Sequence, residues 1–512
     1  MPAFPVNKER KLSNSQHLKK AFIIILILLF SNILLAQAGT TQPLPPSNYG
    51  TENAGTESNP YLISNLSNLR WLSESTTQIG SPNEKAYFSQ TADIDATETI
   101  DWNDGCGFIP IGRNGFWGEY DGNRYSISNL YFKAGPETVD LVGFYFVAMF
   151  YYIEDSTLKN INLENLSLYA EDDEKGFFNP LVNFARNSVI SNCFASGNIS
   201  LIHAFWDGFS FTNAFTSGLV GRIWGTTVEY CYSTVSINRT KWLGYTGSGV
   251  SAGLVGEMEN SVLVYSFFYG EIHYTLNYGG GTVYDNNFTG TLVAVAVDSR
   301  IFFSYGTTRI PLRKWSITGA LVGELGGTII TNCLWDTEAT SFTVLFGQEF
   351  GNPNKIEDNF GLPTEQMKIA QTFIDNGWDF ENIWTIDPEI NNGYPFLKGM
   401  PPPVVSTNDP VIVMPQTQLI GNYPNPFNPE TTIVFNVGNR FNLSESVHVS
   451  IDIYNLRGQK VRRLFDGFVE RGEHTVVWNG KDENGQDVSS GVYLYQMVSD
   501  EGVSTKRMVL MK

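Results

Sequence analysis

Histidine, cysteine and positive charge are scarce in this chain of 512 residues, which has 5 His, 4 Cys and 33 Lys plus Arg against 52 Asp plus Glu. No G-x-S-x-G motif or metal-ligand spacing accompanies the histidines, which leaves His-driven nucleophilic catalysis little basis. Four cysteines without a C-x-x-C pair give neither a zinc site nor a disulfide framework. The net charge of −19 argues against a nucleic-acid partner, because few cations remain to contact phosphates.

Glycine and aromatic residues are abundant instead, with 48 Gly and aromatics at 14%, while charged residues reach only 17%. This composition is typical of β-structure and not of a disordered chain. A length of 512 residues exceeds one compact core, so it indicates several domains or one elongated repeat domain.

The N-terminus has the pattern of a secretory signal peptide. Five basic residues between positions 8 and 20 precede an apolar run at 21–35 and an Ala36-Gln37-Ala38 cleavage signal. The apolar run is short for a bilayer span and contains polar residues. We therefore expect residues 1–38 to be removed, residues 39–54 to form a linker, and the mature chain to have no transmembrane helix.

A small residue followed by Leu-Val-Gly recurs in the middle of the chain, with a Cys or Ser ten residues further on. Clear copies at 218–221, 253–256 and 320–323 lead to Cys231, Ser266 and Cys333, and degenerate copies at 181–183 and 292–294 lead to Cys193 and Ser304. The positions 183, 221, 256, 294 and 323 are 38, 35, 38 and 29 residues apart, and 140–143 resembles an earlier, stretched copy. Such spacing predicts a solenoid.

Short β-rich segments bounded by Gly, Asn and Ser predict that each repeat forms one coil of a right-handed parallel β-helix, in an all-β protein. The Leu and Val side chains would point inward, glycine would permit the tight corner, and the Cys and Ser positions would stack as an interior ladder. We favour free thiols there over a Cys193–Cys231 disulfide, because stacked parallel side chains seldom reach disulfide geometry. The repeat-core residues predicted are Leu219, Gly221, Cys231, Leu254, Gly256, Leu321, Gly323 and Cys333.

The repeat resembles those of the GLUG-repeat bacterial surface proteins. The segments 55–64 and 118–130, with a helix-like stretch at 66–73 between them, resemble the family's first segment, and 361–397 resembles its closing segment. The resemblance implies a β-helix over 55–399 whose open end is covered by the short helix. It implies an architecture and carries little information about function.

The C-terminal part has the pattern of a second domain. A Pro-rich linker at 400–417 precedes alternating segments that predict an antiparallel β-sandwich over 418–512. These segments are 447–454, 460–464, 472–478, 491–498 and 505–511.

This domain closely resembles the type A C-terminal sorting domain of the type IX secretion system, which has an Ig-like fold. The motif residues are Tyr423, Pro424, Asn425, Pro426, Phe427, Asn428, Pro429, Gly458, Gly491, Tyr493 and Lys512. The resemblance implies Sec export, the type IX secretion machinery as a partner, and a secreted or outer-membrane cell-surface location. On their own, the same residues would also suit a β-sandwich without a sorting role.

Candidates for chemistry are few. Asp93, Asp95, Asp101 and Asp104 crowd the first coils, where paired carboxylates would serve polysaccharide cleavage or Ca²⁺ binding, but turn and capping roles explain them equally well. His203 and His273 are expected to be solvated strand residues. We predict no catalytic residue, no cofactor and no metal site.

Aromatic side chains are plentiful in the predicted loops, and the predicted insertions lie at 144–157, 201–216, 238–250 and 274–288. If these leave the solenoid at one corner, they form a ligand-binding face for a glycan or a surface protein. Alternatively, the aromatic residues cover the hydrophobic strands. The residues concerned are Trp117, Trp206, Phe209, Phe211, Trp224, Trp242, Tyr245, Tyr278 and Trp315.

These patterns favour a secreted or cell-surface, non-catalytic, adhesin-like protein. A β-helical polysaccharide lyase or glycoside hydrolase that uses the acidic first coils is the second hypothesis, and a structural component of a surface layer is the third.

Overall fold

The computed structural model describes residues 41–75, 79–139, 143–171, 175–203, 214–242, 247–277, 285–309, 316–403, 418–437, 446–455, 457–470, 472–499 and 502–511. The chain divides into two compact units, Met1–Val405 and Ser406–Lys512. The predicted signal peptide and most of the Pro-rich linker lie outside the described residues.

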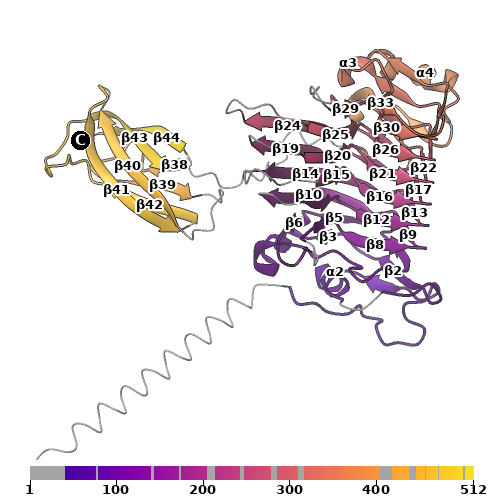
Figure 1. Ribbon diagram of the computed structural model, residues 1–512. Helices are drawn as coiled ribbons and strands as arrows, with labels where there is room; N and C mark the ends of the chain where they lie inside the picture. Colours follow the sequence, from indigo (N-terminus) through magenta and orange to yellow (C-terminus); the bar gives the residue numbers. More distant parts are fainter. Residues whose placement is uncertain are drawn as a thin grey trace, which may run out of the picture. The chain divides into compact units, whose positions relative to one another are not determined.

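The first unit is a parallel β-solenoid, which confirms the predicted fold class (Figure 1). Its described residues form four parallel sheets, which we number 1 to 4. Along the chain, each complete coil contributes a strand to sheet 4, then to sheets 1, 2 and 3, and then returns to sheet 4. Sheet 1 contains β1 (Tyr61–Ile63), β2 (Ala86–Gln90), β4 (Gly118–Asp121), β9 (Thr157–Lys159), β13 (Val189–Ser191), β17 (Thr227–Glu229), β22 (Val262–Val264), β27 (Arg300–Phe302), β31 (Ile329–Thr331) and β34 (Lys355–Glu357).

Sheet 2 contains β3 (Ile94–Asp95), β5 (Ser126–Ser128), β6 (Tyr131–Lys133), β10 (Asn162–Glu171), β14 (Phe194–His203), β18 (Tyr232–Ser233), β19 (Ser236–Trp242), β23 (Phe267–Phe268), β24 (Glu271–Asn277), β28 (Tyr305–Gly306), β32 (Leu334–Asp336) and β35 (Phe360–Leu362). It is extended on one side by the long strands β10, β14, β19 and β24.

Sheets 3 and 4 close each coil. Sheet 3 contains β7 (Tyr145–Val147), β11 (Gly176–Phe178), β15 (Ala214–Ser217), β20 (Gly247–Ala252), β25 (Asp285–Gly290) and β29 (Ile317–Thr318). Sheet 4 contains β8 (Phe150–Glu154), β12 (Val182–Arg186), β16 (Val220–Trp224), β21 (Val255–Glu259), β26 (Val293–Val297), β30 (Val322–Gly326) and β33 (Phe346–Glu349).

The Leu-Val-Gly phrase marks the corner between sheets 3 and 4 in successive coils. Its valines are hydrogen-bond neighbours: Val182 pairs with Val220, Val220 with Val255, Val255 with Val293, and Val293 with Val322. Leu219, Leu254 and Leu321 lie beside them with no exposed surface. The repeat length read from the sequence is therefore the length of one coil.

The earlier copy predicted at 140–143, of which only Gly143 is among the described residues, is not the equivalent of the later copies. Val182 pairs with Phe150 in the coil before it, so Phe150 occupies the position assigned to Val142. The segment 144–157 is likewise no insertion, since it contains β7, β8 and the first residue of β9. Residues of neighbouring coils occupy equivalent positions when their strands pair in register, whereas a short apolar phrase can match by composition alone.

Glycine is needed at the corner for close approach between coils. A Cβ atom on Gly256 would lie 2.6 Å from the carbonyl oxygen of Gly221, and one on Gly323 would lie 2.6 Å from that of Ala294. Neither Gly256 nor Gly323 has a positive φ. The absence of a side chain therefore matters here, and unusual backbone torsion does not.

Small polar residues form two ladders inside the corners. Cys193, Cys231 and Cys333 are free thiols with no exposed surface, and Cys231 N donates to Ser266 Oγ at 3.2 Å, as Ser266 N does to Ser304 Oγ. The sequence did not reveal the second ladder, between sheets 4 and 1, where the hydroxyl of each coil accepts the backbone N–H of the coil before it. This ladder contains Ser156, Ser188, Thr226, Ser261 and Ser299.

The first coil is covered by α2 (Leu66–Ser73), which matches the predicted helix and buries Leu69 and Leu72. The segment 39–54 was expected to be a linker, and its described residues contact this end of the solenoid. Asn48 Oδ1 accepts the N–H of Leu62 at 3.2 Å, and Tyr49 packs on Trp71 with ring centroids 5.1 Å apart. This segment therefore protects the edge of β1.

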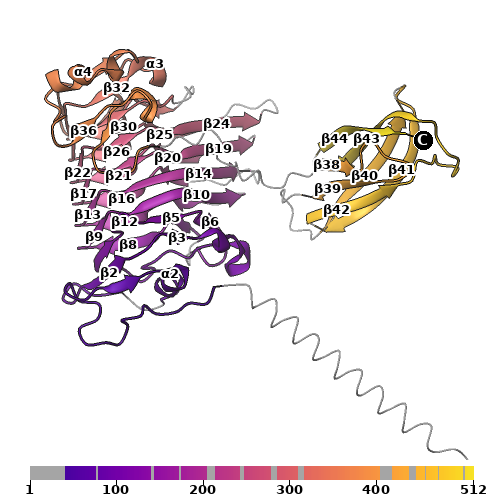
Figure 2. The ribbon, with the colours of Figure 1, turned by 180° about the vertical axis from the view of Figure 1, so that it is seen from behind.

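A row of aromatic rings stacks along the outer face of sheet 2. Phe194, Tyr232, Phe267 and Tyr305 have successive ring centroids 4.8, 4.9 and 5.0 Å apart and nearly parallel planes. The closing segment, residues 363–403, covers this row (orange in Figure 2) and buries Trp384 against it. It contains α4 (Ala370–Asp375), β36 (Trp384–Thr385) and β37 (Phe396–Leu397), while α3 (Thr337–Thr340) precedes β33.

The second unit is a small antiparallel sandwich, as predicted. Its core includes Phe427, Ile451, Trp478 and Met508, which are at most 2% exposed. Sheet 5 contains β38 (Gln418–Tyr423), β39 (Thr431–Val437) and β42 (Gly472–Trp478), and sheet 6 contains β40 (Ser446–Asn455), β41 (Lys460–Glu470), β43 (Gly491–Ser499) and β44 (Gly502–Leu510).

Candidate functional site

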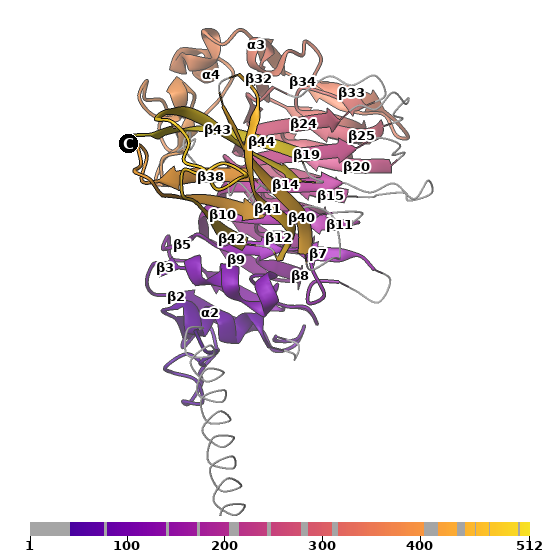
Figure 3. The same cartoon turned by 90° about the vertical axis from the view of Figure 1, so that its left-hand side faces the viewer.

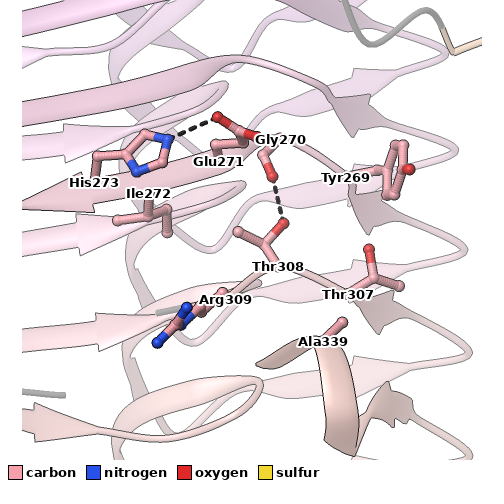
Figure 4. A pocket seen from close by; sticks show the side chains of 9 residues that line it. All are labelled: Tyr269, Gly270, Glu271, Ile272, His273, Thr307, Thr308, Arg309 and Ala339. Atoms are coloured by element: carbon pink, nitrogen blue, oxygen red, sulfur yellow. Dashed lines mark hydrogen bonds and ion pairs between the residues drawn. The ribbon is translucent and has the colours of Figure 1, made fainter. Parts of the chain in front are cut away.

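The solenoid has a step where its coils become shorter. The coil from Val255 to Val293 takes 38 residues, whereas the next, from Val293 to Val322, takes 29. As a result β24 pairs with β19 on one side, and no described strand pairs with its other edge. A pocket of about 490 Å³ lies at this step, and we call it the step pocket (Figure 4).

One wall of the step pocket is β24. The side chain of Ile272 is buried in the solenoid, so its neighbours Glu271 and His273 face outward. His273 Nε2 and Glu271 Oε2 lie 2.6 Å apart, and the two side chains are 56% and 57% exposed. Glu271 thus contacts the imidazole while both side chains stay accessible to a ligand.

The opposite wall comes from the shorter coil. Thr308 Oγ1 donates to Gly270 O at 2.5 Å, which ties the two coils together. The neighbouring Thr307 is only 5% exposed, and its hydroxyl has no hydrogen-bond partner. An unpartnered buried hydroxyl costs free energy, so Thr307 stands out among the pocket residues.

Tyr269 and Arg309 complete the polar lining. Burial raises the pKa of Tyr269, and its ring packs on Tyr394 of the closing segment with centroids 5.5 Å apart. The guanidinium of Arg309 is exposed. Figure 4 shows Tyr269 and Thr307 near one end of the step pocket and His273 and Arg309 near the other.

The step pocket therefore combines hydrogen-bond donors, hydrogen-bond acceptors and one aromatic ring. This lining suits a polar ligand with several hydroxyl groups. Among the described residues, no group of three or more His, Cys, Asp and Glu side chains could hold a metal ion.

The acidic residues of the first coils lie around β3 and in the two short 3-10 helices that follow it. Asp93 accepts the N–H of Ser126 at 2.8 Å, and Asp95 accepts Thr97 N at 3.0 Å and Thr97 Oγ1 at 2.6 Å. The bond from the Thr97 hydroxyl, helped by Asn129, lowers the pKa of Asp95. Asp101 and Asp104 are also exposed. A lowered pKa suits a capping carboxylate and works against a general-acid role.

The two histidines differ in position. His203 ends β14, and its side chain lies outside the described part of the chain. His273 is a solvent-exposed strand residue, as predicted, but sequence reasoning missed the pocket beside it. The shortened spacing between positions 294 and 323 was the signal that could have located this step.

Most residues of the predicted aromatic face lie outside the residues that the structure describes. Trp206, Phe209, Phe211, Tyr245, Tyr278 and Trp315, and the side chain of Trp242, are not described. The described strands that flank these segments are stacked, with β14, β19 and β24 paired in order on one side and β15, β20 and β25 on the other (Figure 3).

The aromatic residues that are described pack on the coils. Trp117 precedes β4 and packs on Tyr152 with centroids 6.3 Å apart, and Trp224 ends β16 and donates to Glu259 at 2.9 Å. On sheet 3, Phe146 and Phe177 are stacked and at most 9% exposed. These contacts fit the alternative in which aromatic residues cover the strands.

The predicted sorting residues divide into buried and exposed groups. Phe427 is 2% exposed and packs on Trp478, with centroids 5.6 Å apart, while its N–H donates to Val509 O at 3.0 Å. Asn425 Oδ1 accepts the N–H of Val509 at 2.9 Å, so this loop is tied to the last strand. Tyr423, by contrast, is 80% exposed.

The remaining motif residues shape the sandwich. Gly458 has φ +76°, which suits the turn between β40 and β41, and Gly491 begins β43. Tyr493 is 8% exposed and its hydroxyl donates to Ser489 O at 2.7 Å. Pro424 and Pro426 are exposed, as are Asn428 and Pro429, and Lys512 lies outside the described residues.

The fold thus defines a class of protein, a parallel β-solenoid followed by an Ig-like antiparallel domain. The family model described as the FlgD Ig-like domain matches residues 431–502. The chain is also similar to Halomucin of Haloquadratum walsbyi, with 32% identity over 154 residues that make up 28% of this chain and 2% of Halomucin. The match therefore spans a very small part of that relative. In the described ranges, no helix has the length and apolar character needed to cross a membrane.

Proposed function

We propose that this chain is a secreted or cell-surface, non-catalytic, adhesin-like protein. The observation that carries the proposal is the stacking of β14, β19 and β24, which places the ends of three successive long strands side by side on a rigid solenoid. A rigid scaffold that holds variable segments in a row is a common basis for recognition. The exposed step pocket lies on the same solenoid.

The export route forms the second part of the proposal. The N-terminal pattern supports Sec export, and the GLUG-like repeats and type A sorting motif support passage through the type IX machinery to the cell surface or medium. The Ig-like domain match over 431–502 agrees with the fold that the sorting family implies. The arrangement of the motif, with Tyr423 exposed and Phe427 in the core, would leave part of it accessible to that machinery.

Deletion of residues 418–512 tests the export route. In the bacterium that produces the chain, we expect the truncated protein to remain in the periplasm and the full chain to reach the surface or medium. Cell fractionation with immunodetection measures this, and a periplasmic marker enzyme controls for leakage. Normal surface delivery of the truncated chain would refute the sorting role.

Binding and catalysis need separate experiments. We expect the purified chain to retain glycans or surface proteins in an array and to release no reducing ends from a polysaccharide panel. Release of reducing ends that is lost in Asp93→Ala or Asp95→Ala would favour the lyase or hydrolase hypothesis. Silence in both assays would favour a structural role in a surface layer.

A further inference from the structure

We infer that the step pocket binds a neutral saccharide. This rests on the proposed function as a surface binding protein and adds a site and a ligand class to it. Three features of the pocket support this ligand: an unpartnered buried hydroxyl, the donors and acceptors around it, and the balance of charge.

The first observation is the Thr307 hydroxyl. The residue is 5% exposed, its Oγ1 has no partner, and it lines the step pocket. In Figure 4 the hydroxyl points toward the side of the pocket on which Tyr269 lies. Its neighbour Thr308 is already bonded to Gly270 O. This Oγ1 has almost no accessible surface, so a rotation of the Thr307 side chain about χ1 would present it to the pocket. A ligand hydroxyl would then satisfy it, since a hydroxyl can both donate and accept.

The second observation is the mixture of partners on the other wall. Glu271 offers carboxylate oxygens, Arg309 offers guanidinium N–H groups, and His273 is held beside Glu271 at 2.6 Å. Saccharide hydroxyls pair with acceptors and donors at once, whereas a purely apolar or purely anionic ligand would leave one set unpaired. The ring of Tyr269 supplies an apolar surface for the C–H groups of a sugar.

The third observation is charge. Glu271 and Arg309 carry opposite charges in the same pocket, and the whole chain has a net charge of −19. An anionic polysaccharide would be repelled by this field, and its carboxylates would also meet Glu271. A neutral saccharide avoids both costs, and the volume of about 490 Å³ is within the usual range of ligand pockets.

Titration calorimetry of the purified full chain tests the inference. The probes are neutral tetrasaccharides of glucose, mannose, galactose and xylose, with a tetragalacturonate for comparison. We expect one or more neutral probes to bind with little dependence on salt. Thr307→Val should weaken this binding about five- to ten-fold, and Arg309→Gln about ten-fold.

Matched controls separate the pocket from the fold. Thr216 is also fully buried with an unpartnered hydroxyl, and it lies on β15 outside the pocket, so Thr216→Val should leave binding unchanged. Arg300 is an exposed arginine on β27 of the same coil, so Arg300→Gln controls for Arg309→Gln. Thermal melting checks that each variant is folded.

The outcomes are distinguishable. Preference for tetragalacturonate, with affinity that falls as salt rises, would overturn the neutral ligand. Saccharide binding that survives Thr307→Val and Arg309→Gln would overturn the pocket and leave the proposed function standing. If the chain binds surface proteins but no saccharide, this inference is wrong and the proposed function stands. If the exported chain binds no ligand at all, the proposed function is wrong as well.

Discussion

At the scale of single residues, small side chains decide how the solenoid is built. Gly221, Gly256 and Gly323 allow one coil to approach the next, and the cysteine and hydroxyl ladders satisfy backbone groups at the corners. Burial raises the pKa of the Cys333 thiol to about 12, so it is inert at neutral pH. The small residues that recur from coil to coil therefore maintain the shape of the solenoid and are not reactive groups.

Gly256→Ala should destabilise the solenoid. Intrinsic propensity alone predicts a small gain, but the new Cβ would lie 2.6 Å from Gly221 O. We expect a loss of roughly 1–3 kcal/mol in the free energy of unfolding, measured with urea. In the second unit, a Cβ on Gly421 would meet nothing within 4 Å, so Gly421→Ala should cost nothing in that unit's unfolding. A gain in stability from Gly256→Ala would contradict the close approach.

Asp452 should give the second unit an acid-sensitive stability. Arg463 donates to its two carboxylate oxygens at 2.8 and 3.1 Å and, with Lys460, lowers the pKa of Asp452 below its ordinary value of 3.8. The stabilisation is present above that pH and is lost as the pH falls through the lowered pKa. Asp452→Asn should therefore be less stable than wild type at pH 7, and the difference should shrink below pH 3.8.

Urea unfolding at several pH values measures this difference. Glu430→Gln is the matched control, because Glu430 is an exposed carboxylate of the same unit. A difference between wild type and Asp452→Asn that stayed constant from neutral to acid pH would contradict the assigned role of the ion pair.

At the scale of elements, no strand of the solenoid is stable alone. Strands of two to ten residues gain stability by stacking, and the outer face of sheet 2 also needs a cover. The closing segment provides it: Tyr232 Oη donates to Pro401 O at 2.8 Å, and Trp378 Nε1 donates to Asn332 O at 3.0 Å. This segment therefore fixes several coils at once.

Trp384→Ala should uncover the stacked aromatic row. Trp384 has no exposed surface and lies within 6.0 Å of the rings of Phe267 and Tyr305. We expect a loss of about 3–5 kcal/mol in the solenoid's free energy of unfolding, measured by denaturant unfolding. Trp224→Ala, on a partly exposed strand end, should cost far less. Equal effects of the two substitutions would show that the closing segment does not stabilise the coils.

At the scale of the whole molecule, the chain has separate cores in its two compact units. The solenoid carries the step pocket and the stacked strands β14, β19 and β24, and the Ig-like unit carries the proposed sorting motif. Binding and export should therefore be separable by mutation.

Phe427→Ala should move only one of two melting transitions. Phe427 packs on Trp478 in the core of the Ig-like unit, and its loss should cost about 3–5 kcal/mol there. Calorimetry should show the solenoid transition unchanged. Tyr423→Ala, at an 80% exposed position, should leave both transitions in place. A single transition that shifts as a whole with Phe427→Ala would contradict independent cores.

The sequence alone determined the coil length, the inward-facing Leu and Val, and five of the seven described strands of the sandwich, while β38 and β39 were not predicted. These features are local or repeated: burial alternates along strands such as β4, and the corner phrase recurs in several successive coils. The same local view misplaced the earliest coil, because 140–143 matches the phrase in composition while Phe150 holds the paired position.

Only the tertiary structure decided which residues meet at the step pocket and over the aromatic row. Gly270 and Thr308 are 38 positions apart, and Tyr232 and Pro401 are 169 apart. Contacts of this kind depend on how many residues each coil contains and on where the chain turns back. They follow from stacking in space, which no single stretch of sequence records.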